Sequence, residues 1–181
     1  MKAIYLDNAA TTQIDEDVLD LMYKSMREDY GNPSSSHQFG RKAKSAVETA
    51  RKNIAKHFNV SASEIVFTAG GTEADNLILN NAVLNLGVKR IIISKIEHHA
   101  VLHTCEHLEN THNIILEFVD VDQFGSIDLN QLKELLSRST DKTLVSLMHI
   151  NNEIGNILPI DKVCELCKSH NALFHSDTVQ A

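Results

Sequence analysis

Short apolar runs rich in β-branched and aromatic residues recur along the chain between segments of mixed polarity. Runs of this kind are typical of strands that are covered on both faces of a sheet, because no position needs to face water. They predict strands at EIVFTA (64–69), RIIIS (90–94), NIILEFVDV (113–121), TLVSLMHI (143–150) and ALFHSD (172–177).

Between these runs, apolar residues recur every three or four positions, which is the period of a helix with one apolar face. The first such series comprises Phe39, Ala43, Ala46, Ala50, Ile54 and Phe58. Similar series are Leu77, Ile78 and Ala82; Val101, Leu102, Cys105 and Leu108; Leu129, Leu132, Leu135 and Leu136; and Val163, Cys164 and Cys167. Alternating strands and helices with short connections predict an α/β fold, with a mainly parallel central sheet and helices on both faces. YGNPSSSHQ (30–38) is expected to be a surface loop.

The composition narrows the class of protein. The 181 residues include 17 Lys and Arg and 24 Asp and Glu, a net charge of −7, which argues against a nucleic-acid surface. No apolar run reaches the roughly 20 residues of a membrane helix, and MKAIYLDNAATT lacks the layout of a signal peptide. Three cysteines do not indicate a disulfide framework. A cytoplasmic protein is expected.

Four polar segments follow the predicted strands: GGTE (70–73), KIEHH (95–99), NNEIG (151–155) and DTVQ (177–180). In a parallel sheet the carboxyl ends of the strands share one edge, and ligands of such sheets bind there. The sequence therefore predicts a binding site built from these four segments.

GGTE has the features of a phosphate site. Gly70 and Gly71 allow a tight turn and a close approach of backbone N–H groups, and Thr72 adds a hydroxyl at the start of the next helix. A plain helix cap is an equally valid interpretation of these residues. A nucleoside triphosphate is not indicated, because no Gly-Lys-Ser/Thr follows.

The other segments supply complementary chemistry. Asp177 ends an apolar run, so its carboxylate needs a positive partner, such as a protonated pyridine nitrogen, or several donors. The alternative is that it caps a helix that follows. His98 could lie flat over an aromatic ring, or be a hydrogen-bonded structural residue. Asn152 could bond a phenolic oxygen or a substrate carboxylate, or form an Asx turn. Pyridoxal 5'-phosphate has all the matching parts.

YLDNAATT, YGNPSSSHQFGRKAKSAVETAR, EIVFTAGGTEADNL, EHHAVLHTC, MHINNEIG and HSDTVQ together resemble the N-terminal half of the cysteine desulfurases, in the class V aminotransferase group. The resemblance implies that Gly71 and Thr72 bind the phosphate of pyridoxal 5'-phosphate, and that His98 stacks on the ring and assists proton transfer. It implies that Asp177 pairs with the ring nitrogen, and that Asn152 and Gln180 bond the phenolic oxygen or the substrate. The implied reaction removes sulfur from L-cysteine and leaves L-alanine and a protein persulfide. A sulfur-acceptor or scaffold protein, and a homodimer at full length, are the implied partners.

The family pattern also has parts that this sequence does not contain. The lysine that anchors the cofactor, the cysteine of a mobile loop, the remaining strands and the small C-terminal domain all come later than Gln180. Residues 1–181 are thus expected to be the N-terminal segment and most of the large domain, inactive alone, prone to self-association and binding the cofactor weakly and non-covalently. A non-catalytic half-chain acting through a partner, an aminotransferase and a selenocysteine lyase remain alternatives.

Two other groups of residues were weighed. Cys164 and Cys167 have redox spacing, but they and Cys105 fit apolar helix faces, so none is expected to carry the persulfide. His99, His103 and His107 are spaced by four residues, so two neighbours could share a metal ion while all three could not. An exposed polar face is the preferred interpretation of these histidines.

Overall fold

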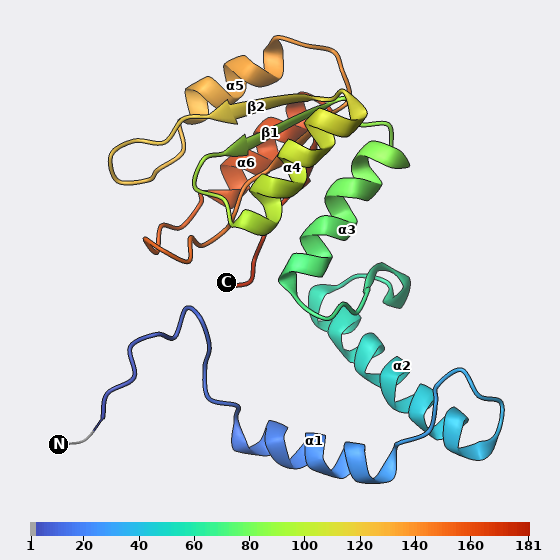
Figure 1. Cartoon of the computed structure of the whole chain (residues 1–181). Coiled ribbons are helices and arrows are strands. Elements are labelled where there is room, and N and C mark those ends of the chain that lie inside the picture. The colour runs from blue at the N-terminus through green and yellow to red at the C-terminus, as the bar shows by residue number, and fades with distance from the viewer. Residues whose placement is uncertain (1–2) are drawn as a thin grey trace. The chain divides into compact units, whose positions relative to one another are not determined.

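The computed structural model describes residues 3–181 (Figure 1). The helices are α1 (Glu16–Glu28), α2 (Gln38–Phe58), the 3-10 turn η1 (Ala62–Glu64), α3 (Gly71–Leu84), α4 (His99–His112), α5 (Leu129–Ser137) and α6 (Ile160–Ser169). The strands are β1 (Arg90–Ser94), β2 (Ile115–Val119), β3 (Thr143–Ser146) and β4 (Leu173–His175). The chain divides between Phe67 and Thr68 into two compact units.

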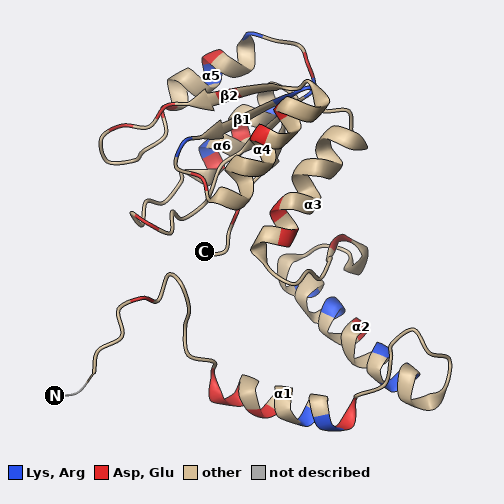
Figure 2. Cartoon of the chain, in the orientation of Figure 1, with Lys and Arg blue, Asp and Glu red and all other residues tan. Residues whose placement is uncertain are grey.

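The first unit consists of α1, α2 and η1. Asp15 caps α1 by accepting hydrogen bonds from the N–H groups of Asp17 and Val18. Acidic residues, red in Figure 2, occupy the first turn of α1. Arg27 lies in its last turn, an arrangement that the helix dipole favours. Lys42 bonds Asp29 at 2.8 Å, which joins the start of α2 to the end of α1 and raises the pKa of the lysine.

The predicted helix over 39–58 is confirmed, but most of its apolar positions are exposed. Of the six predicted positions only Ala43 is buried, while Phe58 is 68% exposed. Helix α1 was not predicted, and its apolar side chains, such as Leu21 and Met26, are exposed as well. None of the helices within residues 3–181 is long and apolar enough to cross a membrane.

The second unit contains a parallel sheet with the strand order β2-β1-β3-β4. Strand β1 lies between two partners, with Ile91 opposite Leu116 of β2 and Leu144 of β3. Strand β4 extends the sheet by pairing with β3. Both the predicted α/β class and the mainly parallel sheet are therefore confirmed.

Helices cover both faces of this sheet. Ile91 and Ile93 pack on one face, in a cluster with residues of α3 and α4 such as Leu79 and Val101. Ile92 points to the other face and packs with residues of α5 and α6 such as Leu132. All five residues of β1 are buried, which explains why its three central residues, Ile91, Ile92 and Ile93, form a continuous apolar run rather than an alternating one.

The expected strand over 64–69 is wrong for this structure. Glu64 closes the 3-10 turn, and Ile65 has extended backbone with φ −94° and ψ 121°. A strand exists only where a neighbour completes its hydrogen-bond ladder, and none of the four described strands pairs with this segment. The strand predicted over 90–94 forms over all five residues, whereas the other three strands form over fewer residues than predicted.

Replacing Ile92 by Ala should lower the free energy of unfolding by about 2–5 kcal/mol, because the fully buried side chain leaves a cavity between β1 and α5. The matched control is Ile115→Ala in β2, where the side chain is 51% exposed, and the expected loss is below about 1 kcal/mol. Urea unfolding followed by circular dichroism measures both. Equal losses in the two variants would contradict the assigned core.

Candidate functional site

The carboxyl ends of β1, β3 and β4 open onto one edge of the sheet, as parallel strands require. The segments that leave this edge carry His98 after β1, Asn152 after β3 and Asp177 after β4. Three of the four expected polar segments therefore meet at one edge. The fourth segment, GGTE, contains the start of helix α3 and lies close to the segment after β4.

Helix α3 begins at Gly71 with Gly70 as its N-cap, and no side chain caps it. The alternative of a plain side-chain cap by Thr72 is thus wrong, since Thr72 lies inside the first turn. The amide of Asn76 donates to the carbonyl oxygen of Thr72 at 2.8 Å, while the threonine side chain is exposed. An uncapped first turn has free N–H groups and the positive end of the helix dipole, which suit an anion.

Gly71 lies against the segment that carries Asp177. A Cβ atom on Gly71 would be 2.6 Å from Cγ2 of Val179, whereas one on Gly70 would meet nothing within 4 Å. A side chain at position 71 would therefore displace the exposed side chain of Val179. The contact brings the first turn of α3 next to residues 177–180.

His98 is the N-cap of α4, and its Nδ1 accepts the N–H of Ala100 at 3.1 Å. Its ring is exposed, so the residue has a structural role and also an accessible face. Because Nδ1 accepts a hydrogen bond, the neutral ring has its proton on Nε2.

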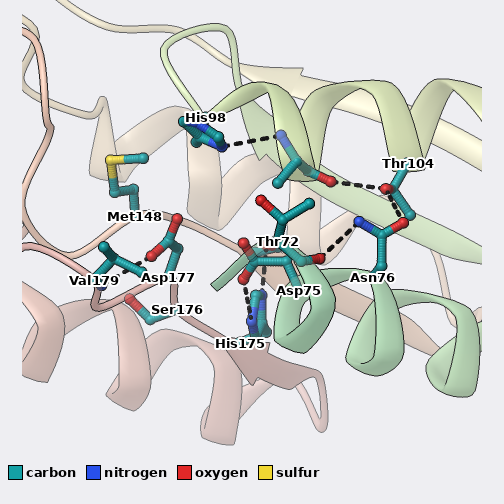
Figure 3. A network of polar contacts seen from close by, with 12 residues as sticks. Thr72, Asp75, Asn76, His98, Thr104, Met148, His175, Ser176, Asp177 and Val179 are labelled. Atoms are coloured by element: carbon teal, nitrogen blue, oxygen red, sulfur yellow. Dashed lines mark hydrogen bonds and ion pairs between the residues drawn. The ribbon is translucent and has the colours of Figure 1, made fainter. Parts of the chain in front are cut away.

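Thr72 and His98 line the same cavity, which has a volume of about 480 Å³. Its wall also includes Asn76 and Thr104, whose side chains connect α3 to α4. The hydroxyl of Thr104 lies 2.8 Å from Oδ1 of Asn76 and 2.7 Å from the carbonyl oxygen of Ala100 (Figure 3). This bridge holds the helix that starts at the GGTE turn against the helix that His98 caps.

Asp177 is 7% exposed, and its Oδ1 accepts the N–H of Val179 at 2.9 Å (Figure 3). The carboxylate thus forms an Asx-type turn, and the described residues 178–181 contain no helix for it to cap, which was the alternative interpretation. A carboxylate that is nearly buried with one such bond retains capacity for a positive partner.

A second buried group, which the sequence did not reveal, lies below the site. His175 Nε2 is 3.5 Å from Oδ1 of Asp75, and its Nδ1 is 2.8 Å from the hydroxyl of Ser146. All three side chains are buried. Asp75 is one turn beyond Thr72 and His175 is two residues before Asp177, so this pair sets the position of α3 relative to β4. A histidine and an aspartate inside apolar patterns were the signal that could have indicated it.

Glu97 is the other buried acid that was missed. Its Oε1 accepts from the Ser94 hydroxyl at 2.6 Å and its Oε2 accepts from the Met148 N–H at 2.9 Å. Burial raises the pKa of Glu97 to about 7; the two hydrogen bonds lower it, and the charges of Asp177 and Asp75 raise it further. Its place directly before His98, at the end of an apolar strand, was the available signal.

The two asparagines after β3, Asn151 and Asn152, make different hydrogen bonds. Oδ1 of Asn151 accepts the N–H groups of Glu153 and Ile154, and its Nδ2 donates to the carbonyl oxygen of Ile96 at 2.7 Å. The Asx turn considered for Asn152 is therefore made by its neighbour. Asn152 is half-buried and donates to Glu153, and Gln180 is half-buried in the last described segment.

The histidine series lines this site, whereas the cysteines do not: His99, His103 and His107 belong to the wall of the cavity that Thr72 and His98 line, and none of the three cysteines does. Burial raises the pKa of Cys105 to about 12 and that of Cys167 to about 11, so neither is a ready nucleophile at neutral pH. The rings of His99 and His103 stack with centroids 4.9 Å apart. Across residues 3–181, no three His, Cys, Asp or Glu side chains are arranged to hold a metal ion.

Comparison with known proteins decides the family. The sequence model of the family described as Aminotransferase class-V matches residues 4–181. This chain belongs to the class V aminotransferase family.

Its relatives are cysteine desulfurases. A putative cysteine desulfurase of Bacillus subtilis (strain 168), IscS 1, is 48% identical over 184 residues, which cover 100% of this chain and 48% of the relative. A solved NifS-like protein superposes with a TM-score of 0.90 at 40% identity, over 98% of this chain and 49% of that one. The structure of SspA in complex with cysteine gives a TM-score of 0.88 at 34% identity, over 98% of this chain and 51% of that one. The chain thus spans about half the length of the proteins that it matches, and what it matches is their N-terminal half.

Glu97 should make stability depend on pH. A carboxyl whose pKa is raised from 4.5 to about 7 by folding binds its proton more tightly in the native state. Its contribution to stability is fully present below about pH 4.5 and is lost as the pH rises through about 7. Between about pH 5 and pH 8, the free energy of unfolding of wild type should therefore fall relative to Glu97→Gln by up to about 3 kcal/mol.

Urea unfolding at several pH values measures this difference. Glu106→Gln, which changes an exposed carboxyl on α4, is the control and should run parallel to wild type. If Glu97→Gln also runs parallel to wild type, the raised pKa is refuted.

Proposed function

We propose that this chain forms the cofactor-binding part of a pyridoxal-phosphate-dependent cysteine desulfurase. The observation that carries the proposal is the meeting of Thr72, His98 and Asp177 around one sheet edge: the first two line one cavity, and Gly71 touches the segment of the third. The family membership and the desulfurase relatives support the same function.

The first turn of α3 fits the phosphate of the cofactor. Its lack of a side-chain cap and the close approach at Gly71 leave backbone N–H groups for an anion, and the exposed hydroxyl of Thr72 adds a donor. The bridge from Thr104 to Asn76 keeps this turn in place. We infer that Gly71 and Thr72 hold the phosphate.

The buried carboxylate of Asp177 fits the ring nitrogen. The carboxylate accepts a hydrogen bond from the N–H of Val179, a protonated pyridine nitrogen would add a positive partner, and the pair would keep the ring cationic. When bound, the cofactor supplies an electron sink for the reacting substrate.

The remaining residues orient the ring and the substrate. The exposed face of His98 is available to cover the ring, with its proton held on Nε2, and Asn152 and Gln180 are assigned to the phenolic oxygen or the substrate. Proton transfer through Nδ1 of His98 would require its bond to Ala100 to open.

The proposed substrate is L-cysteine, with L-alanine and a protein persulfide as products. The desulfurase names of the relatives and the cysteine complex of SspA support this substrate class. We propose that the sulfur passes in the cytoplasm to an acceptor or scaffold protein of iron–sulfur cluster assembly, and that the complete enzyme is a homodimer. The raised pKa values of Cys105 and Cys167 support a persulfide cysteine elsewhere.

Binding of pyridoxal 5'-phosphate tests the site directly. Thr72→Ala should weaken binding roughly tenfold, since a charge-assisted hydrogen bond is lost, and Asp177→Asn should weaken it at least as much. Equilibrium dialysis with absorbance detection measures both. The controls Thr111→Ala and Asp141→Asn change an exposed hydroxyl and an exposed carboxyl away from the site and should bind like wild type. Unchanged affinity in the first pair would refute the assigned cradle.

Activity is tested on the product of the native gene, purified from its own cells. We expect release of sulfide and formation of L-alanine from L-cysteine in the presence of a reductant, and an intact mass about twice the 20.2 kDa of these 181 residues. A native product near 20.2 kDa that releases no sulfur would refute the catalytic function for this polypeptide and leave a half-chain acting through a partner.

A further inference from the structure

Glu97 is buried, acidic and directly before His98, and the proposed chemistry does not use it. Glu97 is 6% exposed. Each of its two carboxyl oxygens accepts a hydrogen bond, one from the end of β1 and the other from the segment after β3. The Ser94 hydroxyl bonds it at the end of β1, and the Met148 N–H bonds it after β3. A carboxyl in this place ties together the two loops that carry His98 and Asn152.

A second bond reinforces the same junction. The side chain of Asn151 reaches from the loop after β3 to the carbonyl oxygen of Ile96, the residue before Glu97. The loop after β1 and the loop after β3 are therefore joined by two side chains: the neutral amide of Asn151 and the ionisable carboxyl of Glu97.

The charged groups around Glu97 come from four elements. Asp75 of α3 and Asp177 after β4 both raise the pKa of Glu97. The charge of Glu97 in turn raises the pKa of the Cys105 thiol in α4. His175 of β4 faces Asp75 rather than Glu97. The N–H of Met148 bonds Glu97, and the N–H of the next residue, His149, donates to the carbonyl oxygen of Asp177 at 2.9 Å, so the two acids are held by neighbouring residues after β3. Together with Asp75 they form a group of three buried carboxyls.

We propose that Glu97 is a positioning residue that couples the charge state of Asp177 to the placement of His98. A cation bound to Asp177 cancels the repulsion that Asp177 exerts on Glu97, so the pKa of Glu97 falls and a larger fraction of Glu97 is ionised near neutral pH. The ionised carboxylate accepts the Ser94 and Met148 hydrogen bonds more strongly than the neutral acid does, which tightens the loop that ends at His98.

A small cavity beside Glu97 gives the released proton a route to solvent. A cavity of about 30 Å³, large enough for a water molecule, is lined by Glu97, Ser94, Asn151 and Asn156. Water there exchanges the proton of the acid with solvent. No oxidant, reductant or further reactant is needed.

The coupling is reciprocal. If a cation at Asp177 favours ionised Glu97, then ionised Glu97 favours the cation. Binding of a pyridinium group should therefore strengthen as the pH rises through the pKa of Glu97. The part of the inference that concerns a bound pyridinium rests on the proposed function, whereas the coupling between the two carboxyls does not.

The first experiment uses the protein without any cofactor. Carbon-13 NMR of the glutamate carboxyls reports the titration midpoint of Glu97, assigned by its absence in Glu97→Gln. We expect Asp177→Asn to move this midpoint to lower pH, because a neighbouring negative charge is removed. Asp141→Asn, which changes an exposed aspartate, should leave it unchanged. An unmoved midpoint in Asp177→Asn overturns the coupling.

The second readout separates positioning from folding. The ring signals of His98 should show an inflection at the midpoint of Glu97 in wild type and in Glu106→Gln, and this inflection should vanish in Glu97→Gln. Gln can still accept the Met148 hydrogen bond, so this variant should remain folded, as its amide spectrum would show. A folded Glu97→Gln protein in which the His98 inflection persists overturns the positioning role.

The third experiment measures the protons released when pyridoxal 5'-phosphate binds. Calorimetry near pH 7 in two buffers of different ionisation enthalpy should show more proton release from wild type than from Glu97→Gln. Equal release with measurable binding overturns the inference, whereas absence of binding in wild type counts against the proposed function and leaves the carboxyl titrations to decide the coupling.

Discussion

The parallel pairing of β1 with both β2 and β3 is the constraint on which the rest of the structure depends. It buries every residue of β1 and gives the sheet two covered faces, with Ile92 on one and its neighbours Ile91 and Ile93 on the other. Because parallel strands end at the same edge, it also brings the segments after β1, β3 and β4 together. The site is a consequence of this register rather than of any local motif.

Buried charge is the second constraint. Asp75, Glu97 and Asp177 are all less than 9% exposed and lie at the same edge of the sheet. Each has a specific partner: His175 for the first, Ser94 and a main-chain N–H for the second, and a main-chain N–H for the third. Since burying carboxylates is costly without compensation, these hydrogen bonds and the contact with His175 offset part of that cost and hold the loops at this end of the sheet.

The failed predictions share one physical cause, which is that local patterns do not specify partners. The run 64–69 has strand composition, but no described strand completes its ladder. The apolar positions of α2 have helical spacing, and the helix forms, yet Phe58 lies in water. Two successive asparagines indicated one turn, and only the structure assigned that turn to Asn151 and not to Asn152.

The sequence by itself determined the α/β class, the four paired strands and the helix at Gly71, and it predicted Thr72, His98 and Asp177 as site residues, because periodicity and the polar ends of apolar runs are local properties. Only the tertiary structure decided which of these residues share a cavity, and it alone revealed Glu97 and the pair of Asp75 with His175. Those groups act across 51 and 100 residues of chain, and contacts over such separations depend on strand order and register, which no local pattern encodes.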